Sequence, residues 1–121
     1  MTTYSELRQE LSERIYPFLI DCVQEEGLDA LDAGGSFYNP DGSKLGPQDS
    51  IGAMVQSYAL YFPSHNKRLV VVISPSGAEE ASVSVFLLHD AVRHIILVDQ
   101  EGFETAWSAI QSTLRDVVGQ I

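Results

Sequence analysis

The sequence predicts a single α+β domain in which a mostly antiparallel sheet of three to five strands packs against an N-terminal and a C-terminal helix. Apolar residues recur at helical spacing near both ends of the chain, and β-branched apolar runs of strand length lie between them. The length of 121 residues is typical of one domain, and a hydrophobic content of 45% is enough for a core without disulfides. We therefore expect residues 1–121 to form one domain.

The N-terminal segment 3–16 has the pattern of an amphipathic helix. Its apolar positions at helical spacing are Tyr4, Leu7, Leu11 and Ile15. Pro17 has no amide donor and disfavours helical geometry at Tyr16, so we expect a kink or a second short helix that stops at Gly27. Cys22, in this second segment, is expected to be a small buried residue.

The middle of the chain is less regular. Residues 33–49 are rich in Gly, Pro, Asn and Asp, and NPDG at 39–42 has the residue order of a type I turn. We expect a short hairpin or edge ribbon there, with a loop as the alternative. Residues 50–63 place six apolar side chains on one helical face and favour a helix. The alternative is a strand that pairs with 68–74.

Three strands and a helix are predicted in the second half of the chain. RLVVVIS at 68–74 and HIILVD at 94–99 are continuously apolar, as in strands that are buried on both faces. Residues 82–89 alternate polar and β-branched side chains and favour a strand, with a helix as the alternative. Residues 102–120 have apolar side chains at steps of three and four, and Trp107 is expected to anchor this helix on the sheet.

The expected order of helix, short NPDG ribbon, helix, three strands and helix is similar to that of small roadblock-type regulatory domains. The resemblance concerns topology alone, and it implies a homodimeric regulatory adaptor. The aromatic cluster Tyr58, Tyr61 and Phe62 is a candidate surface for self-association, because exposed aromatic residues mark interfaces. Burial of this cluster in the core is the alternative.

Acidic residues are concentrated at the N-terminus. The net charge is −10, and the first 32 residues contain eight acids and two bases. A phosphate-binding surface needs clustered Lys and Arg, so direct binding of nucleic acid or of an anionic membrane is disfavoured. A basic protein partner suits this charge, and a solvated helix face is the alternative. The candidate partner-binding residues are Glu6, Glu10, Glu13, Asp21, Glu25 and Glu26.

Two histidines, His89 and His94, bracket a short polar segment that contains Asp90. In a hairpin, two of the three shortest loop lengths would place both imidazoles on one face of the sheet. Zinc needs at least three protein ligands, and only Asp90, Asp99 and the distant His65 are further candidates. We therefore expect residues at a turn, with no metal and no catalytic role. A small metal-binding protein or enzyme that uses both histidines is the alternative.

Several functional classes have no motif in this chain. The sequence contains no GxxxxGK[ST], GxGxxG, GxSxG or HExxH pattern, so we expect neither a cofactor nor catalysis. The single cysteine cannot form an internal disulfide, and no apolar run approaches the roughly 18–20 residues of a membrane span. The sequence thus predicts a non-enzymatic, cytoplasmic protein-binding module, specifically an inhibitor or immunity-type protein that masks a basic partner.

Overall fold

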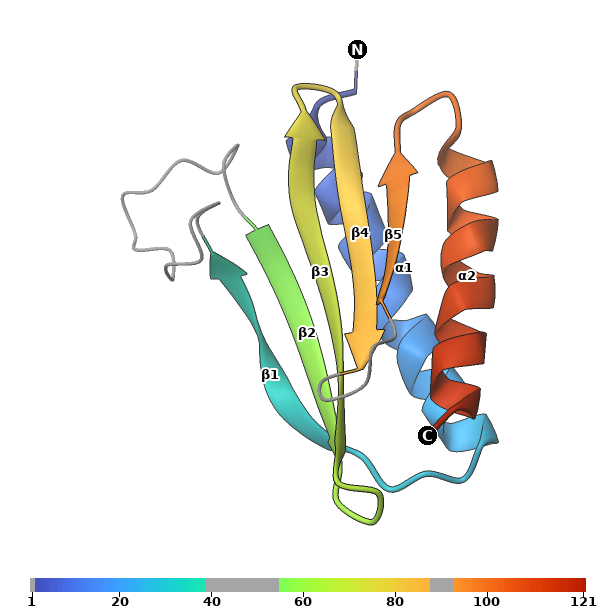
Figure 1. Ribbon diagram of the computed structural model, residues 1–121. Coiled ribbons are helices and arrows are strands. Elements are labelled where there is room, and N and C mark those ends of the chain that lie inside the picture. The colour runs from blue at the N-terminus through green and yellow to red at the C-terminus, as the bar shows by residue number, and fades with distance from the viewer. Residues whose placement is uncertain (1, 39–54, 88–92) are drawn as a thin grey trace.

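The computed structural model describes residues 2–38, 55–87 and 93–121, with residues 32–38 described by their backbone (Figure 1). Five strands pair in chain order into one sheet, and all four pairings are antiparallel. The predicted α+β class is confirmed, with a helix at each end of the chain. The elements are α1 (Tyr4–Glu25), β1 (Leu31–Tyr38), β2 (Val55–Phe62), β3 (Lys67–Gly77), β4 (Glu80–Leu87), β5 (Arg93–Val98) and α2 (Phe103–Gly119).

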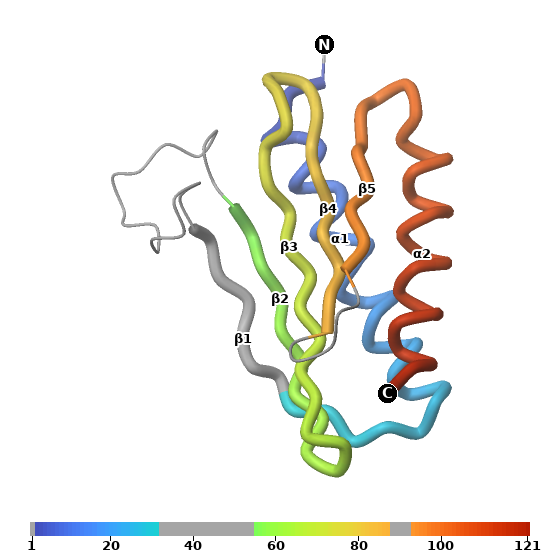
Figure 2. Tube along the Cα trace, in the orientation of Figure 1, coloured from blue at the N-terminus to red at the C-terminus, as the bar shows by residue number. Residues whose placement is uncertain are grey.

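Both helices lie on the same face of the sheet. The Cα trace shows α1 running behind the middle strands and α2 lying beside β5 (Figure 2). Accordingly, α1 contacts β3 and β4, whereas α2 contacts β4, β5 and α1. Among the described residues, no helix covers the opposite face of the sheet, so this part of the chain forms two layers. The core lies between these layers.

The strands alternate between a core side and an outer side. In β3, Leu69, Val71 and Ile73 are completely buried, whereas Val70 and Val72 between them are half-buried. The prediction that 68–74 and 94–99 are strands is confirmed, but the prediction that both faces of them are buried is wrong. The reason is that the helices cover only one face, so alternate residues of a continuous apolar run point away from them.

The predicted helix over 50–63 is wrong where the structure describes it, because Val55–Phe62 is strand β2. β2 pairs with β3 around a turn that ends at Asn66, whose φ of 51° is left-handed. The alternation of strand pairing places Tyr58 and Phe62 in the core, so the interpretation of these two as a self-association surface is also wrong. The helix-containing order that resembles roadblock-type domains is therefore absent from this part of the chain.

Helix α1 passes through Pro17 without a break, so the predicted second helix is wrong. The missing amide would have bonded the carbonyl of Glu13, and both residues are exposed, so water can satisfy this carbonyl. The helix begins after Thr3, whose side chain accepts the Glu6 amide hydrogen bond at 3.4 Å. It ends at Glu25, and the predicted stop residue Gly27 follows the C-cap Glu26 with a left-handed φ of 65°.

The remaining predictions concern β1, β4 and α2. The strand predicted over 82–89 is confirmed as β4, and the C-terminal helix is confirmed as α2. β1 forms an edge of the sheet beside β2, and the NPDG turn at 39–42 lies outside the described residues. No helix of the described chain is long and apolar enough to cross a membrane.

Candidate protein-binding surfaces

Four of the six predicted partner-binding acids share one exposed stripe of α1. At about 100° per residue, Glu6, Glu10, Glu13 and Asp21 fall within an arc of about 80°. This arc lies opposite the buried side of the helix, which contains Leu11 and Ile15 among others. We call these four residues the acidic stripe.

The other two predicted acids lie away from this stripe. Glu25 is exposed but is rotated toward the side of α1 that faces α2. Glu26 is the C-cap residue: its amide donates to the carbonyl oxygen of Cys22, and the amide of the next residue, Gly27, donates to that of Gln24. The structure therefore does not place all six acids on one surface.

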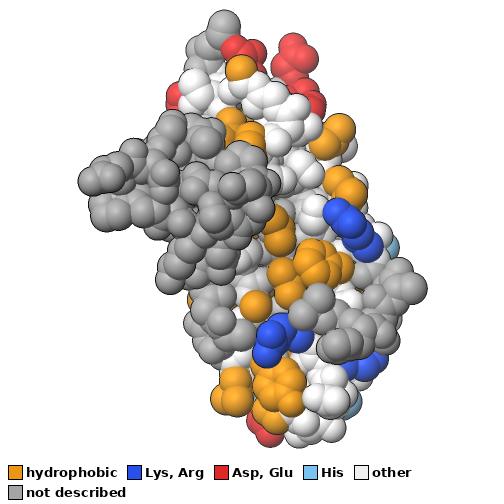
Figure 3. Space-filling view, turned by 60° about the vertical axis from the view of Figure 1, so that its left-hand side comes forward, with side chains coloured by type: hydrophobic (Ala, Val, Ile, Leu, Met, Phe, Trp, Pro, Cys, Tyr) orange, Lys and Arg blue, Asp and Glu red, His pale blue; other side chains and the backbone are white. Residues whose placement is uncertain are grey.

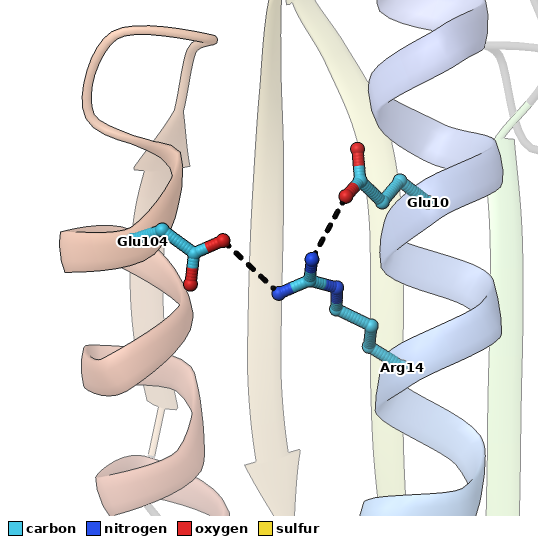
Figure 4. A network of polar contacts seen from close by, with 3 residues as sticks. All are labelled: Glu10, Arg14 and Glu104. Carbon is cyan, nitrogen blue, oxygen red and sulfur yellow. Dashed lines mark hydrogen bonds and ion pairs between the residues drawn. The ribbon is translucent and has the colours of Figure 1, made fainter.

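Glu10 also has a structural partner. Its carboxylate lies 2.9 Å from one guanidinium nitrogen of Arg14, and another nitrogen of Arg14 lies 3.3 Å from Glu104 of α2 (Figure 4). The same guanidinium stacks over the ring of Phe103, 4.8 Å from its centroid. Arg14 thus links the two helices, and Glu10 contributes to this link.

A shallow pocket lies where the two helices begin. It has a volume of about 270 Å³, and Leu7 and Phe103 supply its apolar part. Glu10, Glu101 and Glu104 are the acids in its lining. Such a pocket can take the long side chain of a Lys or Arg, because its methylenes would contact the apolar part and its charged end would meet carboxylates.

Trp107 contributes to the contact between the helices. Its ring meets the edge of Phe18 of α1 at 5.8 Å between centroids, and Arg115 lies 5.0 Å above the Phe18 ring. Trp107 is half-buried, whereas Ile110 and Leu114 of α2 are completely buried in the core. Trp107 packs against the core, and its ring contacts are with Phe18 and Arg14 of α1, so the expectation that it anchors α2 on the sheet stays a prediction.

The second surface is the face of the sheet that points away from the helices, which we call the open sheet face. Strand pairing puts outward-pointing residues into rows, of which Ala59, Val70, Phe86 and Arg93 form one. Ile95 and Leu97 on β5 are 56% and 57% exposed, which is unusual for large apolar residues. The described members of the face are Val55, Ser57, Ala59, Tyr61, Arg68, Val70, Val72, Ser74, Glu80, Ser82, Ser84, Phe86, Arg93, Ile95 and Leu97.

The two layers also differ in charge. The helices α1 and α2 contain seven acids and three bases, whereas strands β2 to β5 contain three bases and one acid. Figure 3 shows hydrophobic side chains in the middle of the visible face with Lys and Arg beside them, and most of its acidic side chains at the top. The helix layer is therefore acidic, and the sheet is weakly basic.

The histidine site of the sequence hypothesis is only partly described. His94 is exposed on β5, and its partner on β4 is Val85. His89 and Asp90 lie outside the described residues. The side chain of Asp99 accepts the amide hydrogen of Gly102 at 2.7 Å, which stabilises the turn before α2. Within the ranges that the structure describes, no group of three or more His, Cys, Asp and Glu side chains could hold a metal ion.

Three buried polar groups stabilise the packing between α1 and the sheet. Burial raises the pKa of Tyr4 to about 12, despite the nearby positive charge of Arg8, and its hydroxyl lies 3.4 Å from the carbonyl oxygen of Ile73. Burial also raises the pKa of Tyr58, whose hydroxyl accepts a hydrogen bond from Gln56. The third group is the guanidinium side chain of Arg8, which is only 6% exposed. The burial of this charged residue of α1 was not predicted from the sequence.

Cys22 was predicted to be buried, and this is confirmed, since it is 4% exposed. Burial, followed by the charge of Glu25, raises the pKa of its thiol. A thiol with a raised pKa stays protonated near neutral pH and is a poor nucleophile. The side chain therefore fills space in the core.

Together these features define a small α+β domain with an acidic helix layer and a sheet face that combines apolar residues with serines and arginines. Comparison of the chain with protein-family models, with curated proteins and with solved structures gave no match.

Proposed function

We propose that this chain is a non-enzymatic protein-binding module that takes a basic partner on the helix layer, in the manner of an inhibitor or immunity-type protein. The observation that carries the proposal is the acidic stripe, whose four carboxylates lie on the side of α1 opposite to its core contacts. Such an array of like charges attracts a basic surface and accelerates association with it.

The neighbouring pocket supports the same choice of partner. Its acids Glu10, Glu101 and Glu104 surround apolar surface from Leu7 and Phe103. A Lys or Arg of the partner could enter there, while the stripe holds further positive charges. The buried Cys22 suits a reducing compartment, which supports the cytoplasm as the place of binding.

The proposal is tested with two variants of equal net charge. Glu13→Lys with Asp21→Lys reverses two acids of the stripe that the Arg14 link does not use. Asp29→Lys with Asp116→Lys reverses two exposed acids outside both the stripe and the pocket. A fluorescent arginine-rich peptide serves as the basic probe, and its anisotropy reports binding.

We expect the stripe variant to bind the peptide about tenfold more weakly than the control variant, and added salt to reduce the difference. Equal affinities of the two variants would show that binding follows net charge alone. That result would contradict a localised partner surface on α1.

A further inference from the structure

We infer that the open sheet face binds the same face of a second copy of this chain. The two sheets pack face to face, and each strand of one copy runs in the opposite direction to the same strand of the other copy. The inference does not rest on the acidic stripe, which lies on the other layer of the molecule. It names both the surface and its occupant.

The apolar character of the face gives the first reason. Antiparallel sheets that border water usually alternate an apolar inner side with a polar outer side. Here the outer side of β3 to β5 contains Val70, Val72, Phe86, Ile95 and Leu97. Only serines of β4, Ser82 and Ser84, lie between the apolar residues of β3 and those of β5. Exposed apolar residues on the outer side of a sheet mark a candidate interaction site, and β5 is also an edge strand.

The charges of the face give the second reason, and they identify the occupant. Arg68 and Arg93 lie near one end of the strands, close to the turn between β2 and β3 and to the start of β5. Glu79 and Glu80 lie at the other end, Glu79 in the turn between β3 and β4 and Glu80 at the start of β4. Between these ends, the outward positions of β2 to β5 contain only apolar residues and serine.

A second copy, turned end for end, matches this pattern. A two-fold axis that lies in the interface and runs across the strands reverses their direction, so each basic end meets the acidic end of the other copy. The apolar middle rows then face each other, as in aligned packing of two sheets at about 10 Å. A partner of uniform charge would complement only one end of the face.

The experiment uses two charge-reversed variants and sedimentation equilibrium. Arg68→Glu with Arg93→Glu makes both ends of the face acidic. Glu79→Arg with Glu80→Arg makes both ends basic. Since each homodimer would then place like charges together at both ends, we expect each variant to dimerise about tenfold more weakly than the wild type. The wild type should reach twice the monomer mass of 13.3 kDa at high micromolar concentration.

Mixing the two variants is the decisive step. In the mixed dimer an acidic end meets a basic end twice, so dimerisation should return close to the wild-type level. The stripe variant Glu13→Lys with Asp21→Lys is the control, and it should dimerise like the wild type. Should either double variant lose the circular dichroism of the folded chain, the single changes Arg93→Glu and Glu80→Arg replace the double variants.

Three results would overturn the inference. The wild type could remain a monomer at high micromolar concentration, or the folded variants could each dimerise as tightly as the wild type. The mixture could also remain monomeric although both variants are folded. A failure of the arginine-rich peptide to distinguish the stripe variant would affect the proposed function but not this inference.

Discussion

The outer surface of the helix layer and the open sheet face differ in how they meet solvent. On α1, the side opposite the core consists of charged and polar residues such as Glu6, Glu13 and Gln24. On the sheet, the side opposite the core retains Val70, Phe86 and Leu97. The outer side of α1 thus has the polar composition of a surface that faces solvent, whereas the open sheet face has apolar residues of the kind found at interfaces. The two proposals follow this difference, because they assign an electrostatic contact to the helix layer and an apolar contact to the sheet.

The largest expected effect separates the two sides of the sheet. Leu87 of β4 is 2% exposed on the core side, and Leu97 of β5 is 57% exposed on the open sheet face. Leu87→Ala should lower the free energy of unfolding by about 2–5 kcal/mol, because it leaves a cavity. Leu97→Ala should change the unfolding of the dilute monomer by less than about 1 kcal/mol. Urea unfolding at low protein concentration measures both, and equal losses would contradict a one-sided core.

The next effect concerns the contact between α1 and the sheet, and it appears at alkaline pH. The ordinary pKa of tyrosine is 10.0, and burial raises that of Tyr4 to about 12. Between these values the unfolded chain loses the proton first, so stability that is present below pH 10 falls as pH rises, by about 3 kcal/mol in total. Tyr4→Phe should remove this part of the decline in the free energy of unfolding between pH 10 and 12, as measured by urea unfolding. An unchanged decline in the variant would show that Tyr4 is not buried as described.

A smaller effect is expected where the two helices meet. Arg14 joins Glu10 to Glu104, and its side chain is about one-third exposed. A double-mutant cycle of Arg14→Met and Glu104→Gln should give a coupling free energy below about 1 kcal/mol that decreases with added salt. A coupling that salt leaves unchanged would indicate a link dominated by packing on Phe103 instead.

The smallest effect is expected on the acidic stripe itself. Glu13→Lys with Asp21→Lys should change the free energy of unfolding by no more than about 0.5 kcal/mol, because both side chains are exposed. Thermal unfolding followed by circular dichroism tests this. A large loss of stability would mean that the stripe has a structural role and would weaken its assignment as a partner surface.

The sequence was sufficient to predict an antiparallel sheet packed by an N-terminal and a C-terminal helix. It was not sufficient to assign every segment between these helices. The helical spacing around Ile110 and Leu114 and the β-branched runs of β3 and β5 gave the correct element types. Residues 55–62 were misassigned because an apolar and aromatic segment fits both a helical face and a strand, and only pairing with β3 decides between them. Pro17 was given too much weight, because an exposed position on a packed helix tolerates the lost hydrogen bond.

The candidate surfaces were predictable to different extents. Local spacing places Glu6, Glu10 and Glu13 on one side of a helix, and the structure has them there. The open sheet face could not be predicted, because the apolar runs of β3 and β5 look the same whether one or both faces are covered. The link from Arg14 to Glu104 joins residues 90 positions apart, which no local pattern reveals.

The most direct test of the two-surface account is the solvent accessibility of methyl groups, measured by NMR with a soluble paramagnetic agent at low and at high protein concentration. Ile95 and Leu97 report on the open sheet face, and Ala109, exposed on α2, is the matched probe of the helix layer. The account predicts that Ile95 and Leu97 broaden at low concentration and become protected at high concentration, while Ala109 broadens equally at both. Equal broadening of Ile95 and Leu97 at both concentrations, or protection of Ala109 instead, would contradict it.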